Sequence, residues 1–85
     1  GKHVVTVRYR KEAGAYELHL RENEEADYTE VSREELHRRM STLKDKYGNL
    51  LYVKLIIPDD SGLSYNEAWS FTVEMLDKYD YYHQN

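Results

Sequence analysis

The run LLYVKLII, Leu50 to Ile57, constrains the fold of this chain more than any other segment. It is apolar on both faces apart from Lys54 and rich in branched side chains, which predicts a central strand covered on both sides, or paired on both edges. Pro58 has no backbone N–H and suits the end of a strand. A chain of 85 residues can build only one modest core, so residues 1–85 are predicted to form a single domain around this strand.

Two alternating stretches precede that run and predict a β-hairpin. Their apolar positions are Val5, Val7 and Tyr9 in the first stretch, and Tyr16, Leu18 and Leu20 in the second. Residues 11–14 join them with a short loop that contains Gly14. The acidic segment 21–27 has no apolar period and predicts an exposed loop, and residues 28–31 predict a short strand.

Two helices are predicted from matching start signals. Ser32 with Glu35, and Ser64 with Glu67, have the spacing of a capping box, in which each side chain bonds a free N–H of the first turn. Apolar stripes follow each start: Leu36, Met40, Leu43 and Tyr47 in the first helix, and Ala68, Thr72, Met75 and Tyr79 in the second. Gly48 is placed to terminate the first helix. Trp69, Val73 and Leu76 widen the second stripe, which predicts that this helix is the more buried of the two.

These elements predict an α+β fold in which two helices pack on one face of a small mixed sheet. If the second hairpin strand pairs in parallel with the 50–57 strand, the crossover through the first helix is expected to be right-handed. Most of the core is expected from Leu36, Met40, Leu43, Val53, Leu55, Ile57, Phe71, Met75 and Leu76. Truncating Leu43 or Leu76 to Ala is expected to cost about 2 to 5 kcal/mol.

Composition argues against several classes of function. The chain has no cysteine, which removes disulfides, thiolate zinc sites and a thiol nucleophile. Its net charge is -4, and its basic clusters are interrupted by glutamates, which argues against a nucleic-acid partner. No apolar run approaches the roughly 20 residues of a membrane helix.

Residues that could carry chemistry have simpler explanations. Asp59 and Asp60 are adjacent and are interpreted as turn residues. The four histidines show no H-x-x-x-H spacing and are expected to be solvated. No G-x-S-x-G elbow and no glycine-rich phosphate loop is present. We therefore expect no enzyme activity, no metal, no cofactor and no small-molecule substrate.

Tyrosine is abundant, with nine copies. Tyr16, Tyr47 and Tyr79 fall in apolar stripes and are expected in the core. Tyr81 and Tyr82 are either interface residues, because aromatic side chains with a polar tip favour interfaces, or a fragment of an incomplete last strand.

The order of elements resembles the periplasmic domain of the ExbD/TolR family of biopolymer-transport proteins. The segments that carry the resemblance are VSREELHRRMSTLKDKYGN (31–49) and LYVKLIIPDDSGLSYNEAWSFTVEMLDKY (51–79). They include the V-S-x-E-E-L helix start, an acidic turn, Tyr65 opening a helix, and Met75-Leu76-Asp77. The acidic segment 21–27 is longer than the family's turn, and the polar ending DYYHQN replaces its closing apolar strand.

The resemblance implies a non-catalytic coupling domain on the periplasmic face of the bacterial inner membrane. A single-pass helix upstream of Gly1 would meet an ExbB- or TolQ-like channel, and the domain, as a homodimer, would pass proton-motive energy to a TonB- or TolA-like protein. An extended partner segment is then expected to add to an exposed sheet edge near Tyr79, Tyr81 and Tyr82, with Asp59, Asp60 and Tyr65 close by. The alternative is a cytoplasmic α/β interaction or adaptor domain. A small hydrolase using Asp59 or Asp60 is a distant third reading.

Overall fold

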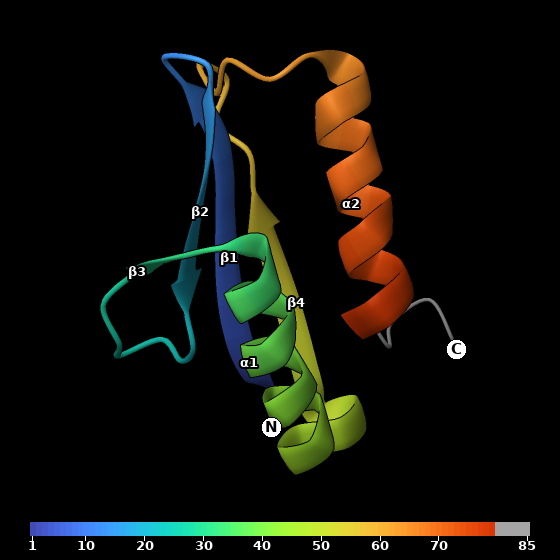
Figure 1. The fold of residues 1–85 in the computed structure, drawn as a ribbon. Helices are drawn as coiled ribbons and strands as arrows, with labels where there is room; N and C mark the ends of the chain where they lie inside the picture. Colours follow the sequence, from blue (N-terminus) through green and yellow to red (C-terminus); the bar gives the residue numbers. More distant parts are fainter. Residues whose placement is uncertain (80–85) are drawn as a thin grey trace.

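The computed structural model describes residues 1–79, which form a four-stranded mixed sheet and two α-helices (Figure 1). The elements follow in the order β1 (His3–Glu12), β2 (Ala15–Arg21), β3 (Thr29–Val31), α1 (Arg33–Tyr47), η1 (Gly48–Leu50), β4 (Leu51–Ile56) and α2 (Tyr65–Tyr79). This is the predicted α+β fold.

β1 is the strand around which the sheet is built. The strand order is β3-β2-β1-β4, with β1 antiparallel to β2 and parallel to β4. The predicted hairpin is confirmed, and its tight turn places Ala13 at φ 50° and Gly14 at φ 81°. Two consecutive positive φ values are typical of the two-residue turns whose twist matches that of the flanking strands.

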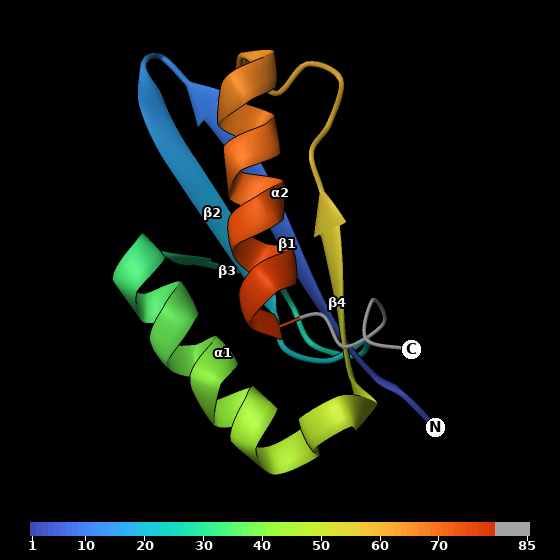
Figure 2. The same cartoon turned by 90° about the vertical axis from the view of Figure 1, so that its right-hand side faces the viewer.

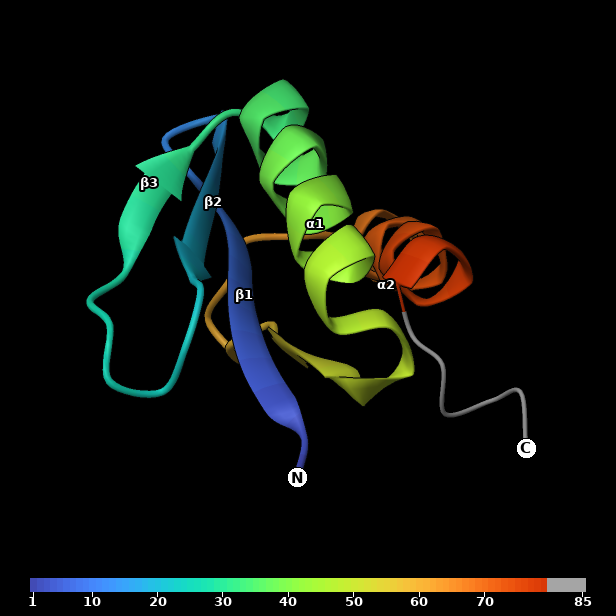
Figure 3. The same ribbon diagram turned by 90° about the horizontal axis from the view of Figure 1, so that it is seen from below.

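Both helices cover the same face of the sheet (Figures 2 and 3). Because side chains alternate along a strand, Val5, Val7 and Tyr9 of β1 all point to that face, and all are buried. Leu36, Met40 and Leu43 of α1 and Phe71, Met75 and Tyr79 of α2 meet them there. One layer of two helices on one sheet therefore encloses a single core.

α1 begins and ends as the sequence predicts. The Glu35 N–H donates to Ser32 Oγ over 3.0 Å at its start. At its end Gly48 adopts φ 56°, and its N–H donates to the Lys44 carbonyl. Glycine suits this position because a left-handed residue carries no Cβ penalty there.

The prediction that the 50–57 run is a central strand was wrong. Within residues 1–79, β4 pairs with β1 alone and forms an edge of the sheet. Tyr52 and Lys54 are exposed, so β4 is covered on one face only. Tyr52 and Ile56 made the run look apolar on both sides, although both point away from the helices. The condition for the predicted right-handed crossover is not met, because β4 pairs in parallel with β1 and not with β2.

The predicted core was partly right. Six of its nine residues are buried, namely Leu36, Met40, Leu43, Val53, Phe71 and Met75, while Leu55, Ile57 and Leu76 are half-buried. Each helix buries three residues, and Trp69, which the sequence places in the wide apolar arc of α2, is 57% exposed. Tyr16, expected in the core, is 52% exposed. The hairpin and β4 supply the core residues that the prediction omitted, among them Val5, Val7 and Leu20, because β1 is the central strand.

Candidate partner-binding edge

Within residues 1–79 the sheet has two edge strands, the three-residue β3 and the longer β4. The outer edge of β4 has no neighbouring strand there. Every second residue of an edge strand leaves its N–H and C=O pointing outward, available to another extended chain. β4 is six residues long, enough to pair with a partner segment of similar length.

An exposed aromatic pair on α2 accompanies this edge. Tyr65 is 81% exposed and Trp69 is 57% exposed, and the two lie four residues apart on one side of the helix. Leu76 continues the same stripe about two turns beyond Trp69 and is half-buried. Exposed apolar surface that is grouped on one side of an element marks candidate binding sites.

The rotation of α2 is fixed by two glutamates on its other side. Glu67 contacts Lys11 and Tyr16 of the hairpin, and Glu74 contacts Arg33 and His37 of α1. These bonds hold the glutamate side of α2 toward the hairpin and α1. The Tyr65–Trp69 side therefore points the opposite way, toward β4, and Figure 2 shows α2 running between α1 and β4. We call β4 with Tyr65 and Trp69 the β4 edge site.

The loop before α2 is anchored to β1. The Lys11 N–H donates to the Ser61 carbonyl over 2.6 Å, and the Ser61 N–H donates to the Pro58 carbonyl over 3.0 Å. Gly62 follows at φ 78°, and a Cβ there would stand 2.4 Å from the Lys11 carbonyl oxygen. Only glycine allows this close approach, which sets where α2 begins relative to the sheet.

The predicted capping box at the start of α2 is complete. The Glu67 N–H donates to Ser64 Oγ over 3.1 Å, and the Ser64 N–H donates to Glu67 Oε1 over 2.8 Å. The backbone bond from Ser64, followed by the bond from the Tyr16 hydroxyl, lowers the pKa of Glu67 to about 2. Glu67 thus caps α2 and ties it to the hairpin.

A second polar cluster joins α2 to α1. Arg33 Nη1 donates to Glu74 Oε1 over 2.6 Å, and His37 lies between Glu74 Oε2 and the Tyr79 hydroxyl, 2.5 Å from each. His37, expected to be solvated, is half-buried here. Burial raises the pKa of Tyr79, and the nearby Glu74 carboxylate raises it further. The cluster is a structural tie between the helices, since its charges satisfy one another.

A groove of about 400 Å³ opens between the hairpin and α2, lined in part by Tyr16, Arg33 and Ser70. The charged groups along it, Arg33, Glu67 and Glu74, are already bonded to one another or to tyrosines. It offers a ligand no unpaired charge among these groups, so we do not place the site there.

The six residues predicted to bind a partner fall into three groups. Tyr65 is exposed at the β4 edge site, and Asp59 and Asp60 are exposed in the connection that leads to it from β4. Tyr79 is 5% exposed and bonded to His37, so it belongs to the core and is not available to a partner in this conformation. Tyr81 and Tyr82 lie outside the described residues.

Trp69 is the residue of the β4 edge site that sequence reasoning missed. It was assigned to an adjacent apolar stripe of the helix that was expected to be the more buried, and it was not among the predicted core residues. The available signal was the width of that arc, because one sheet face covers only about a third of a helix surface and an adjacent stripe stays uncovered. An apolar stripe beyond the covered one predicts a contact with something else.

The histidines other than His37 lie apart from one another within residues 1–79. His3 stacks on Tyr47 at 3.8 Å between ring centroids, and His19 lies on the helix-free face of the sheet. No group of three potential metal ligands occurs among residues 1–79. None of the helices in that range has the length and apolar character needed to cross a membrane. Comparison with family models, curated proteins and solved structures gave no match.

Proposed function

We propose that this chain is a non-catalytic protein-interaction domain that binds an extended segment of a partner at the β4 edge site. Two observations carry the proposal: β4 is an open edge within residues 1–79, and Tyr65 and Trp69 are exposed on the side of α2 that faces away from α1 and the hairpin. Backbone hydrogen bonds along β4 would supply affinity for any extended chain. The two aromatic rings would supply contact area and select the partner's side chains.

We assign this domain the coupling role of the ExbD/TolR kind. Its support is the resemblance in residues 31–49 and 51–79 together with the element order of hairpin, helix, strand and helix. In that role the partner is a TonB- or TolA-like protein on the periplasmic side of the inner membrane. The domain acts as a homodimer, and an anchor helix upstream of Gly1 engages an ExbB- or TolQ-like channel.

The proposed membrane anchor is tested by sequencing the gene upstream of the codon for Gly1. A hydrophobic segment of roughly 20 residues encoded before Gly1 would support the coupling role. A parent without one would instead make the chain an interaction domain of a cytoplasmic adaptor that uses the same β4 edge.

The edge itself is tested by nuclear magnetic resonance titration of the ¹⁵N-labelled chain with an extended peptide from a TonB- or TolA-like protein. We expect amide shifts along β4 and a shift of the Trp69 indole N–H. Two further peptides, each N-methylated on one alternate set of residues, report the mode of binding. Strand addition requires one set of peptide N–H groups to face β4, so one methylated peptide should lose binding and the other should keep it.

Two variants separate the proposed site from general hydrophobic binding. Trp69→Ala should weaken binding of the peptide, and Tyr28→Ala should leave it unchanged. Tyr28 is also an aromatic residue with a partly exposed side chain, but it directly precedes β3, at the opposite edge of the sheet from β4. Equal losses in both variants, or shifts confined to residues 21–27, would refute this placement.

A further inference from the structure

The face of the sheet that the helices leave bare is rich in cations. The strand register places Arg8 beside His19 of β2 and Ile56 of β4, and places Thr6 between Arg21 of β2 and Lys54 of β4. All of these side chains point away from the helices, because Val5 and Val7 point toward them. Figure 3 shows both helices on the other side of β1 and β2.

Three of these cations, Arg8, Arg21 and Lys54, form no ion pair within residues 1–79. Arg33, Arg38 and Arg39 of α1, in contrast, each pair with a glutamate. Like charges on neighbouring strands repel each other. An unpaired cationic row in a chain of net charge -4 is therefore a specific feature of this face.

Tyr28 and the guanidinium groups shape the centre of this face. The Arg8 and Arg21 guanidinium carbons lie 5.6 Å and 5.0 Å from the centroid of the Tyr28 ring. Contacts of this kind hold an arginine in place while leaving its N–H groups free to donate. Among residues 1–79, the buried Nε atoms of Arg10 and Arg21 have no hydrogen-bond acceptor, although Glu17 Oε1 lies 3.8 Å from Arg10 Nε.

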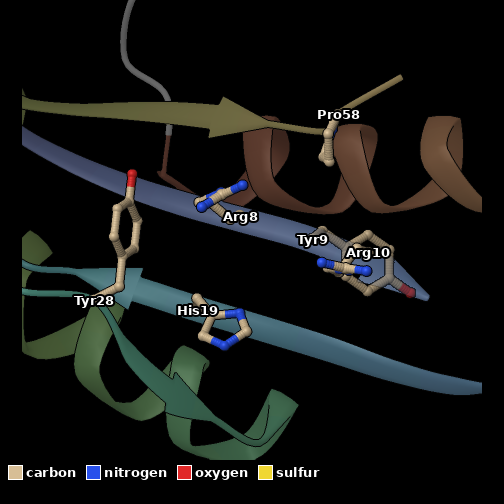
Figure 4. A pocket seen from close by; sticks show the side chains of 6 residues that line it. All are labelled: Arg8, Tyr9, Arg10, His19, Tyr28 and Pro58. Atoms are coloured by element: carbon tan, nitrogen blue, oxygen red, sulfur yellow. The ribbon is translucent and has the colours of Figure 1, made fainter. Parts of the chain in front are cut away.

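A small cavity of about 100 Å³ opens among these side chains, lined by Arg8, Tyr9, Arg10, His19, Tyr28 and Pro58. Figure 4 shows Arg8 between Tyr28 and Pro58, with His19 on the adjacent strand. The cavity is far below the roughly 300 Å³ of a drug-sized ligand site. Its size suits a single small anionic group.

We propose that this cavity binds a phosphate monoester group, with Arg8 and His19 as its direct ligands and Arg21 and Lys54 providing additional positive potential. Arg8 presents a planar fork of donors that matches phosphate oxygens two at a time. His19 supplies a further donor from the neighbouring strand. Donors that line one cavity from two neighbouring strands fit a tetrahedral group with three free oxygens better than a planar carboxylate.

Acidic side chains on the same face compete with an anion for the cationic groups. Glu12 and Glu17 both pair with Arg10, over 3.2 Å and 3.8 Å, and Glu30 stands beside His19 in the β2–β3 register. Glu17 competes with an incoming anion for Arg10. Removing its charge should therefore tighten phosphate binding, whereas removing the charge of Arg8 should weaken it.

The test is a titration of the ¹⁵N-labelled chain with sodium phosphate against sodium chloride at matched, low ionic strength, where surface electrostatics are screened least. We expect saturable shifts at residues 6–10, 19–21 and 28 with phosphate only. Arg8→Gln should weaken binding about tenfold, the usual scale for one charge-assisted hydrogen bond. Glu17→Gln should tighten binding, and Arg8→Lys should recover it only in part, because it restores charge without the fork.

Arg38→Gln is the matched control. It also removes one positive charge, but Arg38 lies on α1, where it is exposed and paired with Glu35. Its phosphate affinity should equal that of the wild type. Circular dichroism and thermal midpoints of all variants check that the fold is retained. The proposal would be overturned if Arg8→Gln and Arg38→Gln weakened phosphate binding equally. It would also be overturned if neither free phosphate nor vesicles with phosphatidic acid gave saturable binding.

Two sources of the phosphate group are separated by a second arm. Vesicles that contain phosphatidic acid present a phosphomonoester on a lipid, and vesicles of neutral lipid are their control. Arg8-dependent binding to the anionic vesicles alone assigns the group to a lipid headgroup, and binding to free phosphate assigns it to a soluble ligand. Binding only to a glutamate-rich peptide, or only to a single-stranded oligonucleotide, would contradict the proposal.

Discussion

α1 and α2 have the same length, 15 residues, and both start after a serine followed by glutamate three residues on. Each buries three apolar side chains against the sheet. They differ in what remains: α1 exposes charged residues, whereas α2 exposes Tyr65 and Trp69. α1 is therefore complete as a structural element, while α2 carries a second apolar surface that residues 1–79 leave uncovered.

The largest expected effect is a difference in stability between truncating a leucine of α1 and truncating a leucine of α2. Leu43→Ala in α1 removes a side chain that is 8% exposed and should destabilise the domain by about 2 to 5 kcal/mol. Leu76→Ala in α2 removes a half-buried one and should cost only about 1 kcal/mol. Urea midpoints of the two variants measure the difference. Equal costs would mean that the Leu76 side of α2 is covered after all.

The next effect concerns how α2 is attached. Gly62→Ala places a Cβ against the Lys11 carbonyl oxygen at a residue with φ 78°. The backbone has to shift, and we expect a loss of about 2 kcal/mol or more. Gly14→Ala, also at positive φ but with open space around it, is the control and should cost less. Thermal unfolding of both proteins compares them.

A smaller difference in stability is expected between removing the N-cap serine of α2 and removing that of α1. Ser64→Ala breaks a reciprocal pair of bonds with Glu67 and should cost about 1 kcal/mol or slightly more. Ser32→Ala breaks the one bond from the Glu35 N–H to Ser32 Oγ, because the Glu35 carboxylate is bonded to Arg38 and Arg39, and should cost less. A larger loss for Ser32→Ala in denaturant titrations would reverse the comparison.

The smallest effect is a pH dependence confined to α2. The folded chain holds the pKa of Glu67 at about 2, below its ordinary value of 4.5. A lowered pKa stabilises the folded state fully above pH 4.5, and this stabilisation is lost as pH falls toward 2. The stability of Glu67→Gln should therefore fall less steeply over that range than the stability of the wild type. Glu24→Gln, in the exposed acidic loop, is the control, and identical profiles for wild type and Glu67→Gln would contradict the assignment.

Much of the fold was predictable because its turns and helix starts depend on short sequence motifs. The hairpin follows from strict alternation and Gly14, and the helix starts follow from Ser32 and Ser64 with their glutamates. These features depend on residues close in sequence, so reading the chain in order recovers them.

Edge positions and uncovered surfaces were not predictable in the same way. The 50–57 run gives no sign that β1 would occupy the centre of the sheet, because strand order is set by pairing between distant segments. Trp69 was placed in the wide apolar arc of the second helix, because periodicity reports apolar character and not what lies opposite. The sequence shows basic clusters interrupted by glutamates, and the gathering of Arg8 and Arg21 on one face appears only once β1 and β2 pair in register.

The central claim is that the Trp69 side of α2 is open in the free chain and covered by a partner. Trp69 is the only tryptophan, so acrylamide quenching of intrinsic fluorescence reports on this site alone. The account predicts strong quenching in the free monomer, and weaker quenching with blue-shifted emission when a tryptophan-free extended peptide is bound. A Trp69 that is already shielded in the monomer, or one whose quenching is unchanged in the complex, would contradict it.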